Sequence, residues 1–186
     1  MARLLIFAGL TAVLAYVSRE PLRLPRSHGF VRFFAWECIV GLVLLNFVGL
    51  RLWFADPFSV HQLISWALLV GSTVPAVPGM VQLLVQGKPS AARPADPSLF
   101  DFEKTTRLVT TGTYRYIRHP LYGSLLLLAW GVYWKRPSWV GTVLAIAATA
   151  LLVATAKAEE EENLKYFGAE YRAYQQTTRM FIPHLF

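Results

Sequence analysis

Two long stretches without an ionised side chain constrain the fold of this chain more than any other feature. No Asp, Glu, Lys or Arg occurs in residues 57–87 or in residues 137–156. A helix needs about 20 predominantly apolar residues to cross the hydrocarbon core of a bilayer, and each stretch is long enough to hold one. Since 55% of the residues are hydrophobic and only 16% are charged, a water-soluble fold is disfavoured. The sequence therefore predicts an integral membrane protein.

Apolar segments predict an all-α, integral membrane helical bundle of about five transmembrane helices, with residues 1–186 forming a single membrane domain. The segments are residues 2–17, 33–50, 58–86, 121–134 and 139–156. The third would reach about 43 Å as a straight helix, against a core of roughly 30 Å, so Pro75 and Pro78 are expected to kink or end it. The fourth would reach only about 21 Å and is expected to form a short hairpin with the fifth.

The distribution of basic residues predicts the orientation of this bundle. Residues 1–86 hold helices 1–3, residues 87–120 form a loop, and residues 121–186 hold the hairpin and an amphipathic tail helix. The first loop, the 87–120 loop and the tail carry fourteen of the 18 Lys and Arg residues. The positive-inside rule therefore places the long loop and the C-terminus in the cytoplasm, and the N-terminus, on a retained first helix, outside. Topology also explains the net charge of +7, so no nucleic acid partner is expected.

A basic and aromatic loop, residues 112–119, leads directly into the fourth apolar segment at Pro120. Proline suits the first turn of a helix. The free N–H groups and positive dipole end of that helix would then lie beside Arg115, Arg118 and His119, where a ligand carboxylate could bind. Aromatic and basic side chains also serve as plain interfacial anchors, and from the residues alone the two interpretations are about equally supported.

A run of four glutamates, Glu159 to Glu162, follows the fifth apolar segment. A solvated charge run is the default interpretation of such a stretch. Helical spacing nevertheless places Glu160 on an apolar stripe with Leu164, Phe167, Tyr171 and Tyr174, although Gly168 could interrupt the helix. The pattern favours an inward-facing Glu160.

Other ionisable residues give weaker indications. Glu37 lies within the second apolar segment, where an ion pair with Arg32 or snorkelling to the interface is expected. His28, His61 and His184 are too scattered for a metal site, and we expect no metal.

Together these motifs resemble a known family. The residues that carry the resemblance are Arg118-His119-Pro120-Leu121-Tyr122, then Glu159-Glu160, Leu164, Phe167-Gly168, Tyr171, Tyr174 and Arg179 to Pro183. This pattern is similar to that of the isoprenylcysteine carboxyl methyltransferases and the related phospholipid N-methyltransferases, over about residues 108–183. The chain departs from it at Thr113, where the family commonly has proline, and at Ser124, where glycine is usual and Gly123 stands one place earlier.

The resemblance implies that S-adenosylmethionine binds between the loop before the fourth helix and the tail after the fifth. The implied cofactor-binding residues are Arg118, His119, Pro120, Tyr122, Glu159, Glu160, Phe167 and Tyr171. Arg118 suits the cofactor carboxylate, a glutamate suits its ammonium group, and aromatic rings suit adenine or the sulfonium. Arg172 or Arg179 is the candidate catalytic residue that would position a carboxylate acceptor, whereas an amine acceptor would need a base.

The expected function is S-adenosylmethionine-dependent methyl transfer to a lipophilic or lipid-linked acceptor at the cytoplasmic membrane face, most similar to isoprenylcysteine carboxyl methylation. Phospholipid or small-molecule N- or S-methylation remains open. A rival class, the NADPH-dependent sterol or enone reductases, typically carries Asn where this chain has Pro120. A non-enzymatic membrane subunit is the remaining alternative.

Overall fold

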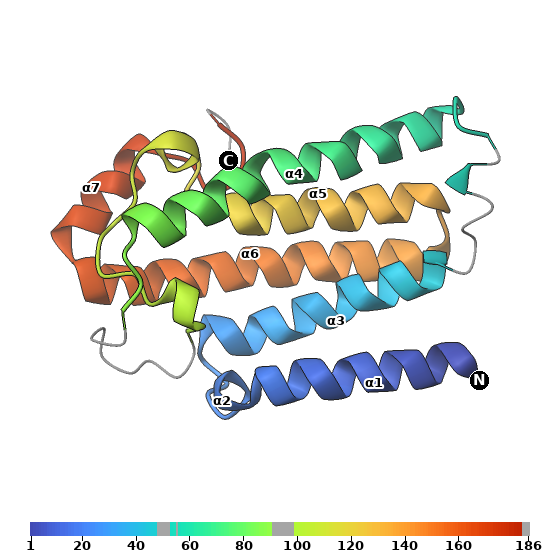
Figure 1. Cartoon of the computed structure of the whole chain (residues 1–186), viewed down its shortest axis with the longest axis horizontal. Coiled ribbons are helices and arrows are strands. Elements are labelled where there is room, and N and C mark those ends of the chain that lie inside the picture. Colours follow the sequence, from blue (N-terminus) through green and yellow to red (C-terminus); the bar gives the residue numbers. More distant parts are fainter. Residues whose placement is uncertain (48–52, 55, 91–98, 184–186) are drawn as a thin grey trace.

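The computed structural model describes residues 1–47, 53–54, 56–90 and 99–183, and these form a bundle of helices (Figure 1). The helices are α1 (Ala2–Val17), α2 (Arg19–Leu22), α3 (His28–Phe47), α4 (Val60–Gln86), α5 (Pro120–Lys135), α6 (Trp139–Phe167) and α7 (Ala169–Thr177), with short 3-10 turns η2 (Asp101–Glu103) and η3 (Gly112–Arg115) between α4 and α5. No strand occurs in this part of the chain, so the all-α prediction is confirmed. Residues 48–50 of the second predicted segment, residues 91–98 of the predicted 87–120 loop, and His184 lie outside the described residues.

Within the described residues, three helices are long and apolar enough to cross a membrane. They are His28–Asn46 within α3, Val60–Gln86 (α4) and Trp139–Phe167 (α6). Helices α1 and α5 have 16 residues each, or about 24 Å of rise, which is less than the roughly 30 Å core. All five nevertheless run side by side in Figure 1. The count of five crossings stays a prediction.

The long helices pack in two pairs, α4 with α5 and α3 with α6. Small residues bring α4 and α5 close together: a Cβ added at Gly79 would lie 3.0 Å from Pro120, and Ser65 Oγ donates a hydrogen bond to the Gly131 carbonyl at 2.6 Å. Close approach at small residues is typical of helices in membranes. The opposite face of α4 exposes large apolar side chains, namely Val70, Val74, Val77 and Val81, as lipid contact requires.

Helix α4 continues through Pro75 and Pro78 as a single α-helix. The alternative that these prolines end the third apolar segment is therefore wrong. Each proline removes one backbone hydrogen bond, a loss that a helix tolerates when neighbouring helices support it, and here α5 packs along α4.

Helix α6 extends beyond the predicted segment and includes the glutamate run, residues 159–162. The prediction ended this helix at Ala156, whereas the structure continues it to Phe167. Gly168 then adopts φ +60, a conformation that favours glycine, and separates α6 from α7 as the sequence suggested. The segment between α4 and α5, residues 87–119, is called the connector. Its described residues lie with helices α2 and α7 at the end of the bundle opposite the N-terminus (Figure 1).

Candidate functional site

A pocket lies at this end of the bundle, with about 700 Å³ of empty space including its open mouth. It is bordered by the end of α4, the connector, the start of α5, the end of α6, and α7. Seven of the expected cofactor-binding residues line it: Arg118, His119, Pro120, Tyr122, Glu159, Phe167 and Tyr171. Two segments about 40 residues apart in sequence therefore meet around one cavity.

Helix α5 begins at the pocket. Pro120 is its first residue and His119 is the N-cap. The loop before it is pinned by the C-terminal tail, since the N–H groups of Arg118 and His119 donate to the carbonyls of Arg179 (2.8 Å) and Met180 (3.1 Å). The positive end of the α5 dipole thus borders the cavity, where it favours an anionic group of a ligand.

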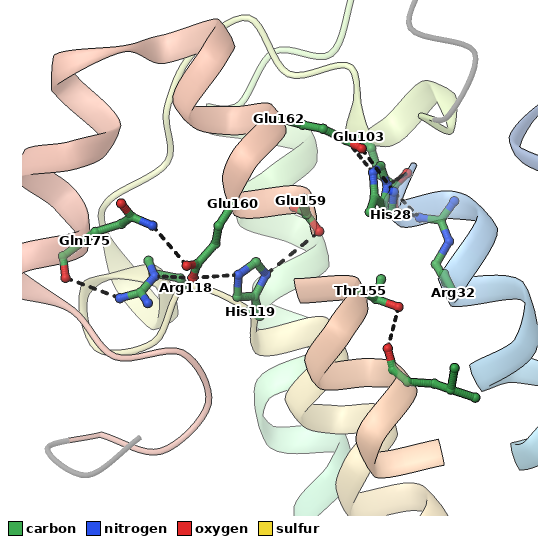
Figure 2. A network of polar contacts seen from close by, with 11 residues as sticks. His28, Arg32, Glu103, Arg118, His119, Thr155, Glu159, Glu160, Glu162 and Gln175 are labelled. Carbon is green, nitrogen blue, oxygen red and sulfur yellow. Dashed lines mark hydrogen bonds and ion pairs between the residues drawn. The ribbon is translucent and has the colours of Figure 1, made fainter. Parts of the chain in front are cut away.

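Glu160 links the two motif segments, because it contacts Arg118, His119 and Gln175 (Figure 2). Its carboxylate accepts hydrogen bonds from Arg118 Nε (2.6 Å) and Gln175 Nε2 (2.9 Å), and His119 Nε2 lies 3.2 Å from it. Only 12% of the Glu160 side chain is exposed, so the inward orientation expected from the apolar stripe is what the structure has. Glu160 does not itself line the cavity; it holds Arg118 and His119, which do.

The other glutamates of the run point in different directions. Glu159 lines the cavity, with its carboxylate 3.8 Å from His119 Nδ1. Glu161 is exposed. Glu162 faces α3, where it accepts a hydrogen bond from the backbone N–H of His28 at 3.0 Å. The interpretation of this run as a solvated face is therefore wrong for Glu159, Glu160 and Glu162.

Aromatic residues form the tail side of the pocket. Tyr171 and Tyr174 on α7 are buried and pack with Tyr114 from η3, whose carbonyl accepts a hydrogen bond from the Tyr174 hydroxyl at 2.6 Å. Burial, reinforced by the nearby Glu159 carboxylate, raises the pKa of the Tyr114 and Tyr171 hydroxyls. Both phenols therefore remain neutral at physiological pH.

The Tyr122 hydroxyl is a polar atom available to a ligand. It is buried and makes no well-formed hydrogen bond to the described residues, with the Glu159 carboxylate close by. The Tyr122 ring stacks on His119 at 5.5 Å between centroids. Buried hydroxyls without partners are uncommon, because each loses its bonds to water. A bound molecule could satisfy this one.

The two departures from the family pattern have local explanations. Thr113 has a backbone N–H that donates to Gln82 Oε1 at 3.0 Å, a bond that proline could not make. Gly112 adopts φ +60, and a Cβ there would lie 2.0 Å from the Gln82 side chain. Ser124 is accommodated because its hydroxyl donates to the Leu121 carbonyl at 2.6 Å within α5. Neither departure places a new side chain in the pocket.

The structure does not bring the candidate catalytic arginines to the pocket. Arg172 and Arg179 are exposed and do not line it. Arg172 directly follows the inward-facing Tyr171, so helical geometry turns it away. Arg179 contributes through its backbone, which bridges to the loop before α5. Glu37 also differs from expectation, since it accepts a hydrogen bond from Thr11 Oγ1 on α1 at 2.7 Å and is not paired with Arg32.

A second charged cluster, which the sequence did not indicate, lies beside the first (Figure 2). His28 and Arg32 from α3 meet Glu103 from η2 and Glu162 from α6. Burial alone would raise the pKa of Glu103, but the Arg32 guanidinium and the His28 ring outweigh burial and hold this pKa at about 2. In the described residues, no group of three or more His, Cys, Asp or Glu side chains could hold a metal ion.

Comparison with known proteins agrees with the motif pattern. Residues 95–170 match a family model described as phospholipid methyltransferase. The resemblance to this family of membrane methyltransferases is confirmed. The match covers α5, all of α6 and the first two residues of α7, and leaves α1 to α4 outside it.

Two relatives of this methyltransferase type are S-methyltransferases. Methanethiol S-methyltransferase of Pseudomonas deceptionensis is 32% identical over 97 residues, which cover 51% of this chain and 33% of that protein. Methanethiol S-methyltransferase 1 of Bradyrhizobium diazoefficiens is 34% identical over 79 residues, covering 41% of this chain and 26% of that protein. The chain thus spans a third or less of the length of these relatives. No solved structure matches it at a comparable level of significance.

Proposed function

We propose that the pocket binds S-adenosylmethionine and that the chain transfers its methyl group to a lipophilic acceptor at the cytoplasmic face of a membrane. The observation that carries the proposal is the convergence of the Arg118–Tyr122 motif and the Glu159–Tyr171 motif on one cavity. The family match over residues 95–170 supports the same chemistry, and the basic bias of the loops supports the orientation.

The residues of the pocket fit this cofactor. The α5 N-terminus with Arg118 suits an amino-acid carboxylate, Glu159 suits an ammonium group, and Phe167 and Tyr171 offer faces to a sulfonium or an adenine. The buried Tyr122 hydroxyl supplies a further hydrogen-bonding group. When bound, the cofactor would supply a methyl group on a positively charged sulfur, which is open to in-line displacement.

The protein's own contribution is to orient the reactants and exclude water. Apolar side chains from the connector and α4, among them Leu83, Leu99 and Val109, also line the pocket. A poorly hydrated site that aligns nucleophile and methyl carbon accelerates such a transfer without acid catalysis, because the leaving group is a neutral thioether. His119 is held with both ring nitrogens facing carboxylates, an arrangement suited to fixing the wall of the site.

The charges of the pocket favour an acceptor that is not a carboxylate. The basic side chains among its described lining residues are Arg118 and His119, and both face Glu160. Arg172 and Arg179, which were expected to position a carboxylate acceptor, are exposed elsewhere. We therefore propose a lipophilic acceptor without a carboxylate, with a small thiol as the first choice because both matched relatives bear the name methanethiol S-methyltransferase. The thiolate is the reactive form and needs no base once formed.

An acceptor panel tests this function. Detergent-purified protein would be incubated with S-adenosylmethionine labelled on the methyl group and, separately, with a short-chain thiol, a prenylcysteine and phosphatidylethanolamine. We expect label transfer to the thiol and S-adenosylhomocysteine release in equal amounts. Transfer to the prenylcysteine carboxyl alone would contradict the acceptor assignment, and absence of transfer to every acceptor would contradict the methyl-transfer function.

A further inference from the structure

The second charged cluster links α3 to the wall of the pocket. Glu103, on η2, lines the cavity. On its other side the Glu103 carboxylate accepts a hydrogen bond from Arg32 Nη1 and lies 3.7 Å from His28 Nε2. Arg32 and His28 are fully or almost fully buried, and neither lines the cavity. Both contact the pocket-lining Glu103.

Aromatic contacts reinforce this link. The Arg32 guanidinium lies over the Phe100 ring at 4.2 Å and near the Trp36 ring at 5.2 Å, and the two rings are stacked 5.7 Å apart. Phe100 directly precedes η2, and its N–H donates to Glu103 Oε2 at 2.9 Å. The connector is therefore docked on α3 by a cation–π contact and an ion pair at the same point.

Glu162 completes the cluster from α6. Its carboxylate bonds to the ring and the backbone N–H of His28, the first residue of α3. A carboxylate at a helix N-terminus satisfies a free N–H group and interacts favourably with the helix dipole. Glu162 lies one turn after the pocket-lining Glu159, so the cluster joins the connector, α3 and α6 at one place.

We propose that Arg32 and His28 are positioning residues for the reaction, which act through Glu103 to hold the connector segment 99–109 as a closed wall of the pocket. This inference rests on the proposed function. Both residues lie outside the matched region 95–170. Helix α3 would thus contribute to catalysis in this chain although none of its residues lines the cavity around the motif residues.

The test compares Arg32→Gln with Arg23→Gln, a control that breaks an exposed ion pair with Glu20. Hydrogen–deuterium exchange without any ligand should show faster exchange in residues 99–109 of Arg32→Gln only. In the methyl-transfer assay the same variant should raise KM for S-adenosylmethionine about tenfold, with kcat changed less than about threefold, because the Glu103 carboxylate on the wall loses its guanidinium partner.

A double variant separates positioning from general stability. Arg32→Gln combined with Glu103→Gln removes both charges of the pair. Removing both partners costs less than removing one, so hydrogen exchange in residues 99–109 and KM for S-adenosylmethionine should return towards the wild-type values. If Arg32→Gln does not fold, Arg32→Lys, which keeps the charge but loses the planar fork, takes its place. Exchange in 99–109 equal to that of Arg23→Gln, or uniformly faster exchange in all helices without rescue, would overturn the proposal. Since exchange needs no substrate, it remains decisive if methyl transfer fails.

Discussion

At the scale of single residues, the end of α6 distributes carboxylates to different neighbours. Glu160 holds Arg118 and His119, Glu159 faces the cavity, and Glu162 binds His28. Glu161 remains in solvent. Consecutive helical residues point about 100° apart, so a run of identical side chains can serve several partners at once. The run is therefore better understood as separate residues than as one charged patch.

Glu160→Gln should weaken binding of S-adenosylhomocysteine, although Glu160 does not line the pocket. The change removes the charge that fixes Arg118 and His119, and losing one charge-assisted hydrogen bond costs on the order of 1.5–3 kcal/mol, or roughly 10- to 150-fold in affinity. Calorimetry on detergent-purified protein would measure it. Glu161→Gln is the matched control, because Glu161 is exposed whereas Glu162 pairs with His28. Equal, small effects of both changes would refute the role of Glu160.

His119→Asn should raise KM for S-adenosylmethionine more than it lowers kcat. Asparagine keeps a hydrogen-bonding side chain next to Glu160, and a thiolate acceptor needs no proton carrier at the transfer step. Steady-state kinetics with the cofactor varied would separate the two effects. A large loss of kcat with unchanged cofactor affinity would instead point to a proton-transfer role and to an amine acceptor.

At the scale of elements, the described residues of the connector form one wall of the pocket. Its described residues include η2 and η3, and a backbone bridge joins Pro89 to Thr105. Gly87 lies at the end of α4, where an added Cβ would sit 2.6 Å from the Thr105 side chain, so only glycine allows this close contact. Thr105 therefore lies against the end of α4, and Glu103, two residues earlier, is paired with Arg32 of α3.

The stability of this connection should depend on pH. The pKa of Glu103 is lowered from 4.5 to about 2, so its ionised form stabilises the fold fully above pH 4.5, and this contribution is lost as pH falls towards 2. Thermal unfolding in detergent from about pH 6 to about pH 3 would show a steeper fall in Tm for wild type than for Glu103→Gln. Parallel curves would show that Glu103 adds no pH-dependent stability.

At the scale of the whole molecule, α2, α7 and residues 99–119 share one end of the bundle and the N-terminus lies at the other (Figure 1). The pocket lies at the same end, because residues of α7 and of the 99–119 segment line it. This arrangement and the basic bias predict a cytoplasmic C-terminus and an N-terminus on the opposite side. Reporter fusions at both ends would test the topology. A cytoplasmic signal at both ends would mean an even number of crossings. One of the five helices that lie side by side would then not cross the membrane.

The sequence predicted the parts of this molecule that local patterns encode. Helical spacing found the stripe from Glu160 to Tyr174 even across the break at Gly168, and proline at the start of a helix found the beginning of α5. Arg172, a candidate catalytic residue from the sequence, lies one residue past this stripe and is exposed, a placement that the same spacing implies. The cluster of His28 and Arg32 was not predicted, because Glu162 lies 134 residues from His28 and Glu103 lies 71 residues from Arg32. No local periodicity records such tertiary contacts.

The central claim, that the cavity between α5, α6 and α7 is a methyl-donor site, is tested most directly by calorimetry with S-adenosylhomocysteine and with NADPH on the same detergent-purified protein. We expect S-adenosylhomocysteine to bind at one site per chain, NADPH not to bind, and Glu159→Gln to weaken the first interaction while Glu161→Gln leaves it unchanged. Binding of NADPH without S-adenosylhomocysteine would identify a reductase-type site and contradict this account, as would binding of neither.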